Sequence, residues 1–121
     1  MLDRRDFVAA LLFDRGNLLV VCGLGSATYD VAAAGDHPLN FYLWGAMGGT
    51  AMIGLGLALA RPDRRVAVIT GDGDMLMGLG SLATIGAQQP NNLPSSCSTM
   101  PIMVKPACSR VTHKRGSILR Q

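Results

Sequence analysis

Aromatic and charged side chains are both scarce in this sequence. Aromatic residues account for 5% and charged residues for 16% of the 121 residues. Basic residues are not interleaved with aromatic ones, so the sequence lacks the stacking platform on which single-stranded nucleic acids bind. The net charge of +3 does not alter this interpretation, because the basic residues Arg110, Lys114, Arg115 and Arg120 all lie at the end of the chain. We therefore expect no nucleic-acid partner.

Paired cysteines and membrane-spanning segments are lacking as well. The three cysteines, Cys22, Cys97 and Cys108, are an odd number without C-x-x-C spacing, which argues against a disulfide framework and against a zinc site. The opening residues MLDRRDF mix acidic and basic groups, unlike a signal peptide. The longest apolar run, residues 45–60, is shorter than the roughly 20 residues of a bilayer-spanning helix. We expect a cytoplasmic protein without a membrane segment.

What the sequence does contain is a high share of hydrophobic residues, 49%, arranged in alternating helical and strand-like segments. Residues 3–15 carry apolar side chains at helical spacing and are followed by a glycine. Residues 18–22 and 66–70 are continuous apolar runs, which is typical of strands buried on both faces. Residues 47–60 and 74–88 are the other expected helices. Because strands and helices alternate, we predict one α/β domain with a doubly wound parallel sheet.

The expected helix at residues 47–60 contains four glycines: Gly48, Gly49, Gly54 and Gly56. Each glycine inside a helix costs about 1 kcal/mol relative to alanine. A close approach of the helix backbone to another element or to a ligand would explain them, since glycine permits such an approach. For Gly48 and Gly49, a position in the loop before the helix is an equally good interpretation.

The turn Gly71-Asp72-Gly73-Asp74 joins the second strand to the last helix. A turn of this kind presents backbone N–H groups and the positive end of a helix dipole, which suits a phosphate. The carboxylates would repel a phosphate unless a cation lies between them, and Mg²⁺ binds one or two carboxylates together with phosphate oxygens. The alternative is purely structural, with Asp74 as the helix cap and Asp72 as a turn residue.

Two glycine motifs occur in this region, G-x-M-G at residues 45–48 and G-D-G at residues 71–73. Together with their surroundings, residues 40–93, they closely resemble the pyrophosphate-binding domain of thiamine diphosphate-dependent enzymes, especially sulfopyruvate and phosphonopyruvate decarboxylases. Residues 22–39 resemble it more loosely. The resemblance implies a 2-oxo acid decarboxylase, a carbon–carbon lyase, with thiamine diphosphate and Mg²⁺ as cofactors.

The resemblance also implies a role for each motif residue. Asp72 would ligate Mg²⁺, and the backbone of Gly73 and Asp74 would hold the diphosphate. The Gly45 carbonyl would accept a hydrogen bond from the aminopyrimidine amino group, and Met47 would hold the cofactor bent. Ordinary core packing is the alternative for Met47. The full set of expected cofactor-binding residues is Gly45, Ala46, Met47, Gly71, Gly73 and Asp74.

A partner follows from the same resemblance. In this family a glutamate on a separate pyrimidine-binding domain activates the cofactor, and this chain has no room for that domain. We therefore expect no catalytic residue in this chain, a pyrimidine-binding partner subunit in a hetero- or homo-oligomer, and a small 2-oxo acid as substrate. The sequence does not identify the acid, since His37, Tyr42 and Trp44 are as compatible with structural roles as with substrate contact.

The sequence after Leu93 departs from the family pattern. The family continues with a buried strand and then L-D-N-x-x-Y-G, whose Asn is the second metal ligand; Asn91 and Asn92 precede that strand and form a turn. Codons displaced by one frame after residue 93 can spell an apolar strand followed by L-D-N-x-x-Y-G. Our hypothesis is that residues 1–93 are a truncated cofactor-binding domain and that residues 94–121 are an irregular, frameshift-derived tail. A strand beside the site would be lost, because proline cannot donate to a central ladder.

Other interpretations stay open. The tail could be a basic interaction arm, and the whole chain a non-catalytic remnant. The Gly23-Leu24-Gly25 turn after the first strand suggests a dinucleotide-binding module, but Thr28 stands where the third glycine of that motif is expected, and Asp36 comes too early for its ribose-binding acid. Because one carboxylate holds a metal weakly, we expect impaired cofactor binding by the chain alone.

Overall fold

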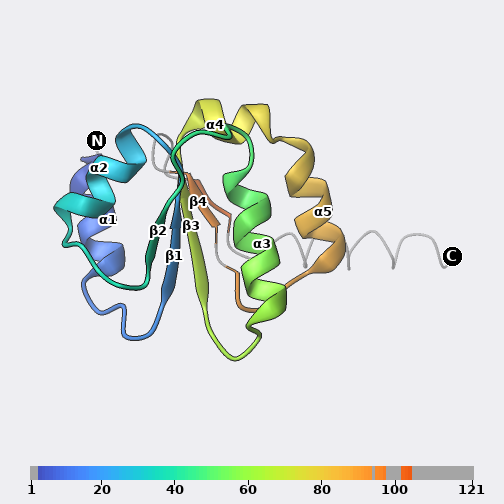
Figure 1. The fold of residues 1–121 in the computed structure, drawn as a ribbon, viewed down its shortest axis with the longest axis horizontal. Helices are drawn as coiled ribbons and strands as arrows, with labels where there is room; N and C mark the ends of the chain where they lie inside the picture. The colour runs from blue at the N-terminus through green and yellow to red at the C-terminus, as the bar shows by residue number, and fades with distance from the viewer. Residues whose placement is uncertain (1–2, 94, 98–101, 105–121) are drawn as a thin grey trace, which may run out of the picture.

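The structure, a computed structural model, describes residues 3–93, 95–97 and 102–104. Helices and strands alternate along most of it (Figure 1). The strands are β1 (Leu19–Cys22), β2 (Asn40–Tyr42), β3 (Val66–Thr70), β4 (Ser95–Cys97) and β5 (Ile102–Val104). The helices are α1 (Arg4–Leu12), α2 (Ser26–Ala33), α3 (Thr50–Ala60), α4 (Asp72–Met77) and α5 (Gly80–Gln88).

The sheet has the strand order β2-β1-β3-β4-β5. The first four of these strands are parallel, with Val21 of β1 opposite Phe41 of β2 and Val68 of β3, whereas β5 runs antiparallel to β4. Helices α1 and α2 cover one face of the sheet, and α3 and α5 cover the other (Figure 1). This confirms the predicted doubly wound α/β fold.

Each face of the sheet has its own hydrophobic core. The core under α1 and α2 consists of Val8, Leu12, Leu18, Val20, Cys22, Ala27, Val31, Ala67 and Ile69. The core under α3 consists of Val21, Leu55, Ala58, Val66, Val68 and Leu93. All five residues of β3 are buried, because the strand lies centrally with helices on both sides. This explains why β3 has no polar alternation in its sequence. The predicted strand at residues 66–70 is confirmed.

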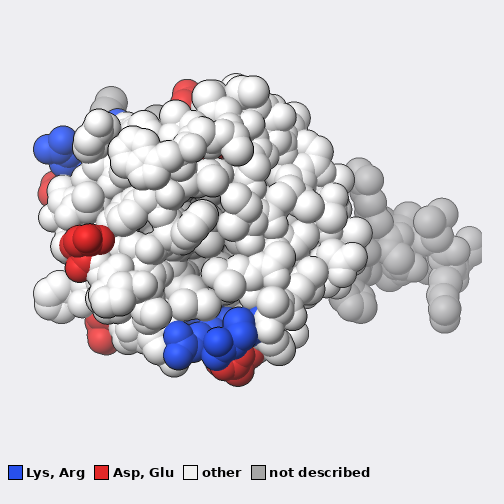
Figure 2. All heavy atoms as spheres, in the orientation of Figure 1, with Lys and Arg blue, Asp and Glu red and all other residues white. Residues whose placement is uncertain are grey.

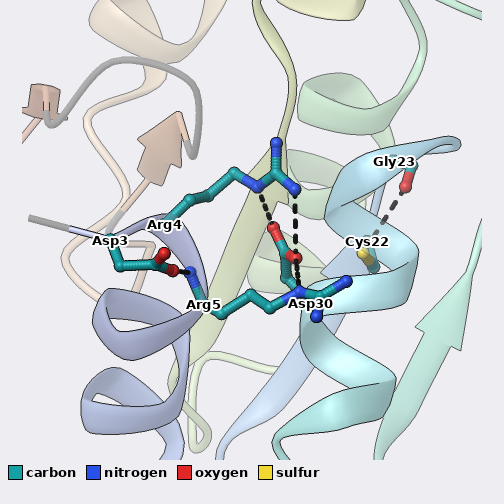
Figure 3. Close-up of polar contacts among 6 residues, drawn as sticks. All are labelled: Asp3, Arg4, Arg5, Cys22, Gly23 and Asp30. Atoms are coloured by element: carbon teal, nitrogen blue, oxygen red, sulfur yellow. Dashed lines mark hydrogen bonds and ion pairs between the residues drawn. The ribbon is translucent and has the colours of Figure 1, made fainter.

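An ion-pair cluster joins α1 to α2 (Figure 3). Asp30 of α2 is 1% exposed, and its carboxylate accepts hydrogen bonds from the guanidinium groups of Arg4 and Arg5. Asp3 caps α1 by accepting from the backbone N–H of Arg5 at 2.7 Å. A buried carboxylate requires such partners, since an unpaired charge in the interior is strongly unfavourable. The cluster therefore fixes the start of α1 against α2.

The four glycines near α3 differ in their structural role. Gly48 and Gly49 lie in the loop before the helix, which begins at Thr50. A Cβ atom at Gly54 would lie 2.1 Å from Cγ2 of Val68, so α3 packs its backbone directly on β3. A Cβ at Gly56 would meet nothing within 4 Å. Close approach thus explains Gly54 and does not explain Gly56.

The single helix predicted at residues 74–88 is wrong in one respect, because the chain forms two helices there. Helix α4 ends at Met77 with Gly78 as its C-cap, and α5 begins at Gly80. A Cβ at Gly78 would lie 2.1 Å from the carbonyl oxygen of Gly48, so the two backbones are in direct contact at this point. The chain bends around the neighbouring loop, and a straight helix would run into it. Helix α2 and strand β2 were also not predicted.

We expected the sheet to lack the strand beside β3, and this expectation is wrong, because the backbone forms a strand there. Residues of β4 pair in parallel with β3, with Ser96 opposite Ile69, and β5 pairs with β4. Neither β4 nor β5 contains a proline, so every residue of these two short strands has the backbone N–H that a ladder requires. The predicted irregularity of residues 94, 98–101 and 105–121 lies outside the described residues, and the frameshift hypothesis stays a prediction.

The turn predicted at Asn91 and Asn92 is present, and it lies at the amino-terminal ends of the strands. The Asn92 side-chain amide donates to the carbonyl oxygens of Ala58, Arg61 and Arg64 at 2.8–3.0 Å. These bonds satisfy carbonyl groups at and beyond the end of α3, which a helix leaves without partners. Asn92 is therefore a structural residue. No helix in the described part of the chain has the length and hydropathy of a membrane span.

Candidate functional site

Both glycine motifs lie at the carboxyl-terminal edge of the parallel strands. The G-x-M-G loop follows β2 and leads into α3, while the G-D-G turn follows β3 and begins α4. Figure 1 shows this loop and α4 side by side at the top of the molecule. Open α/β sheets bind ligands at this edge, because the loops after the strands gather there. The sequence alone indicated the two motifs, and the fold brings them together.

The carboxylate of Asp74 connects the two motifs. Its Oδ1 accepts a hydrogen bond from the backbone N–H of Gly48 at 2.5 Å, and its Oδ2 accepts one from the Thr70 hydroxyl. Asp74 is only 6% exposed. Its side chain thus points into the protein, and only its backbone can face a ligand at the turn.

Two further close contacts lie between the loop and α4. The backbones of Gly48 and Gly78 lie so close together that a Cβ at Gly78 would overlap the Gly48 carbonyl. The Cε atom of Met47 lies 3.3 Å from the position that a Cβ would take at Gly73. Met47 is 44% exposed, so it is not an ordinary core residue. It lies over the G-D-G turn with one side accessible, and its contact with a cofactor stays a prediction.

The G-x-M-G loop has an unusual backbone. Gly45, Ala46 and Gly48 all have positive φ angles, of 99°, 49° and 92°. Left-handed geometry is readily adopted by glycine and costs about 1 kcal/mol or more for alanine. Cβ atoms at Gly45 and Gly71 would meet nothing within 4 Å, so the space beside both backbones is free for a ligand. This open, tightly turned backbone fits close approach of a cofactor.

Asp72 lies at the first position of α4, on the surface. Its Oδ1 accepts from the backbone N–H of Gly73 at 2.9 Å, and the residue is exposed. Among residues 3–93 no group of three His, Cys, Asp or Glu side chains could hold a metal ion. One exposed carboxylate suits Mg²⁺ only if other oxygen ligands, such as phosphate, complete its coordination. The assignment of Asp72 as metal ligand stays a prediction.

A buried polar cluster below the motifs was missed by sequence reasoning. A Cβ at Gly23, just after β1, would lie 2.8 Å from Thr70 Oγ1, 2.9 Å from Asp74 Oδ2 and 3.1 Å from Thr50 Oγ1. The Thr50 hydroxyl is buried and has no hydrogen-bond partner among the described groups. Position 23 therefore requires glycine for packing. The glycine directly after a buried strand was the available signal, but it suggested a dinucleotide motif.

The other groups near β1 and β2 have structural partners. Burial raises the pKa of the Cys22 thiol to about 11, in spite of the opposing hydrogen bond with Thr28. The Tyr42 hydroxyl donates to Asp36 Oδ1 at 3.0 Å, and His37 Nδ1 accepts from the backbone N–H of Leu39 at 3.1 Å. His37 precedes β2 and so lies at the edge of the sheet away from the motifs.

Trp44 differs from these residues, because it directly precedes Gly45 and is 77% exposed. Other exposed apolar side chains surround the same edge of the sheet: Met47, Leu76, Met77 and Leu79. Large apolar groups concentrated around a candidate site indicate a surface that a ligand or another chain covers.

A groove of about 410 Å³ lies between β2 and α3, toward the amino-terminal ends of β1 and β2 and away from the two motifs. Figure 2 shows a hollow near the centre of a face that carries its charged groups at the margins. The groove is lined by Leu19, Val20, Val21, Pro38, Leu39, Asn40, Phe41, Ile53 and Leu57. None of these side chains is ionisable, so the groove lacks the carboxylates that are found at the G-D-G turn.

Comparison with known proteins identifies the family. Residues 23–93 match the model of the C-terminal TPP-binding domain of thiamine pyrophosphate enzymes. The chain belongs to this family. The match begins at Gly23 and includes both motifs, so it supports the interpretation of the turn after β1 as part of this domain and not of a dinucleotide-binding module.

Individual relatives carry decarboxylase names. The chain is 43% identical over 93 residues to the sulfopyruvate decarboxylase subunit beta of Methanothermobacter thermautotrophicus, covering 77% of this chain and 50% of that protein. It is 38% identical over 91 residues to the same subunit of Methanococcus maripaludis, covering 75% and 49%. It is 49% identical over 74 residues to the phosphonopyruvate decarboxylase of Streptomyces viridochromogenes, covering 61% and 18%. This TPP-binding chain thus spans half or less of the length of these relatives.

Proposed function

We propose that this chain is the thiamine diphosphate- and Mg²⁺-binding subunit of a 2-oxo acid decarboxylase of the sulfopyruvate or phosphonopyruvate type. The family match over residues 23–93 carries this proposal, because it contains both motifs that the fold brings together. The relatives named above are sulfopyruvate and phosphonopyruvate decarboxylases. A non-catalytic remnant remains the second candidate, since Asp72 is the single exposed carboxylate of the Gly71-Asp72-Gly73-Asp74 turn.

The residues of the site would bind and orient the cofactor. The backbone N–H groups of Gly73 and Asp74 would hold the diphosphate at the G-D-G turn, and the carboxylate of Asp72 would hold Mg²⁺. The Gly73 N–H donates to Asp72 in this structure, so that bond would be exchanged for one to phosphate. Gly45 and Met47 would hold the pyrimidine and the bend of the cofactor. When bound, thiamine diphosphate supplies the electron sink for loss of carbon dioxide from the acid.

A partner subunit would complete the site. The acidic residues of this sequence are all aspartates, so the activating glutamate that the family resemblance implies lies outside it. Two of the relatives are themselves named as subunit beta. The exposed apolar side chains at the site edge, among them Trp44 and Leu76, would pack against a pyrimidine-binding subunit.

The proposal is tested by thermal unfolding of the protein with thiamine diphosphate and Mg²⁺, and separately with NAD. A ligand at 100 times its Kd raises the free energy of unfolding by about 2.7 kcal/mol. We expect stabilisation by thiamine diphosphate that requires Mg²⁺, that Asp72→Asn removes and that Asp63→Asn preserves, because Asp63 is an exposed residue in the loop between α3 and β3. Stabilisation by NAD alone would contradict the proposal.

The frameshift hypothesis sharpens this test. We expect weak cofactor binding by the chain as it stands and tighter binding by the protein expressed with the reading frame restored after residue 93. Sequencing of the gene through the codons for residues 91–103 decides whether that frame exists. If the restored protein also fails to bind thiamine diphosphate, the proposed function is wrong.

A further inference from the structure

The side chain of Asp74 is buried between two segments and has no part in the predicted role of this residue. The family resemblance gives only the backbone of this residue a function. Yet its carboxylate is almost fully buried and accepts hydrogen bonds from two segments at once: the Gly48 N–H of the G-x-M-G loop and the Thr70 hydroxyl at the end of β3. Each carboxylate oxygen thus has its own donor, so the group connects the loop to the sheet.

We propose that Asp74 is a positioning residue, whose carboxylate holds the G-x-M-G loop against the G-D-G turn in the arrangement that binds the cofactor. The importance of this arrangement for catalysis rests on the function proposed above, whereas the positioning itself is a property of the free protein. The loop carries Gly45 and Met47, so its placement sets where the predicted pyrimidine contacts lie relative to the predicted diphosphate site.

The loop needs such a restraint. Positive φ angles at Gly45, Ala46 and Gly48 are not the preferred state of a free chain, least of all for alanine. The Gly48 N–H, which is partly buried, would lack its acceptor without Asp74, and a shielded N–H without a partner is unfavourable. The contact of Gly48 with Gly78 limits the approach of the two backbones but provides no bond that would keep them together.

Two substitutions at position 74 separate positioning from charge. In Asp74→Asn, the Oδ1 atom can still accept from the Gly48 N–H, while Nδ2 donates to the Thr70 oxygen, so both connections are retained. In Asp74→Ala, both are removed. A matched control is Val8→Ala, which destabilises the core under α1 and α2 without touching the loop, since Val8 is fully buried in that cluster.

Amide hydrogen exchange at Gly48, measured by NMR, reports on the bond itself. We expect exchange at Gly48 to be at least about tenfold faster in Asp74→Ala, because a hydrogen bond to a charged group is lost. The exchange rate of the Gly48 amide in Asp74→Asn should stay within about threefold of the rate in the parent protein if the hydrogen bond to Oδ1 of the substituted side chain is kept. In Val8→Ala, amides throughout the domain exchange faster in proportion to lost stability, without a selective change at Gly48.

The only tryptophan provides an independent spectroscopic readout. Trp44 directly precedes Gly45 and is largely exposed, so its emission responds to displacement of the loop. We expect a changed emission spectrum of the folded protein in Asp74→Ala, an unchanged one in Val8→Ala, and restoration in Asp74→Asn. Unaltered exchange at Gly48 and unaltered emission in a folded Asp74→Ala protein would overturn the proposal.

Titration with thiamine diphosphate and Mg²⁺ distinguishes this inference from the proposed function. If the parent protein with its frame restored binds the cofactor, Asp74→Ala should weaken binding at least about tenfold and Asp74→Asn should restore it. Equal binding by Asp74→Ala would refute the positioning role while leaving the cofactor assignment intact. If no variant binds, the proposed function fails, and exchange at Gly48 still decides whether Asp74 positions the loop.

Discussion

Alanine substitutions at Gly54 and Gly56 test how closely α3 packs on the sheet. Both glycines lie inside the same helix, two residues apart, and differ in the space beside them. Gly54 faces Val68, and a Cβ there would lie only 2.1 Å from Cγ2 of that side chain, whereas a Cβ at Gly56 would be in open space. The two variants make the same chemical change, so each serves as the control of the other.

The expected magnitudes follow from two opposing effects. Replacing glycine by alanine inside a helix stabilises it by about 1 kcal/mol, and this gain applies to both positions. At Gly54, overpacking costs about 1–3 kcal/mol, because Val68 is a β-branched residue with 0% exposure in the central strand and cannot turn away. We therefore expect Gly56→Ala to be about 1 kcal/mol more stable than the parent protein, and Gly54→Ala to be about 1–3 kcal/mol less stable than Gly56→Ala.

Urea unfolding followed by far-ultraviolet circular dichroism measures this difference, and thermal unfolding gives an independent value. For a domain of this size, 1 kcal/mol corresponds to a shift of about 4–8 °C in Tm. Equal stability of the two variants would refute the close packing of α3 on β3. Destabilisation by Gly56→Ala would show that a group outside the described residues, or another chain, approaches the outer face of the helix.

Three further predictions concern buried polar groups. Arg4→Ala should destabilise the fold by about 1–3 kcal/mol in urea unfolding, and by more than Arg5→Ala, because Arg4 makes two contacts with buried Asp30 and Arg5 makes one at 3.4 Å; equal effects would contradict the geometry of this cluster. Thr50→Val should stabilise the protein by about 1 kcal/mol, since its buried hydroxyl lacks a described partner; a loss of stability would indicate that this hydroxyl is hydrogen-bonded, for example to a buried water. Because the pKa of Cys22 is raised in the folded state, the thiol keeps its proton there at a pH at which the unfolded state has lost it. The free energy of unfolding should therefore fall as pH rises from 9.0 to about 11, by about 1.4 kcal/mol per pH unit. Cys22→Ala should remove that slope.

The fold class could be predicted because its signals are local. The continuous apolar run of β3 follows from burial on both faces and is visible without any knowledge of its neighbours. Helix α2 and strand β2 were not predicted, because their sequences carry no comparably clear local pattern. Strand β2 has only three residues, and its burial is partial because it lies at the edge of the sheet, so it lacks a hydrophobic pattern.

The family motifs were also within reach of the sequence, because cofactor chemistry requires particular residues at particular spacings. Glycines at positions 45, 48, 71 and 73 and the carboxylate of Asp72 form a pattern that few other functions share. What each residue contacts was not within reach. The inward direction of the Asp74 side chain depends on Gly48, which is 26 residues away in sequence.

The amino-acid sequence by itself thus determined the alternation of helices and strands, the buried central strand and the presence of two cofactor motifs, since each depends on hydrophobicity or residue type over a short segment. Only the tertiary structure decided that the helix after the G-D-G turn breaks at Gly78, that Gly23 must remain without a side chain and that Asp74 faces inward. The physical reason is the same in all three cases. Steric contact and hydrogen bonding between distant segments arise only when the chain packs, and at Gly23 and Gly78 close packing leaves no room for a Cβ atom.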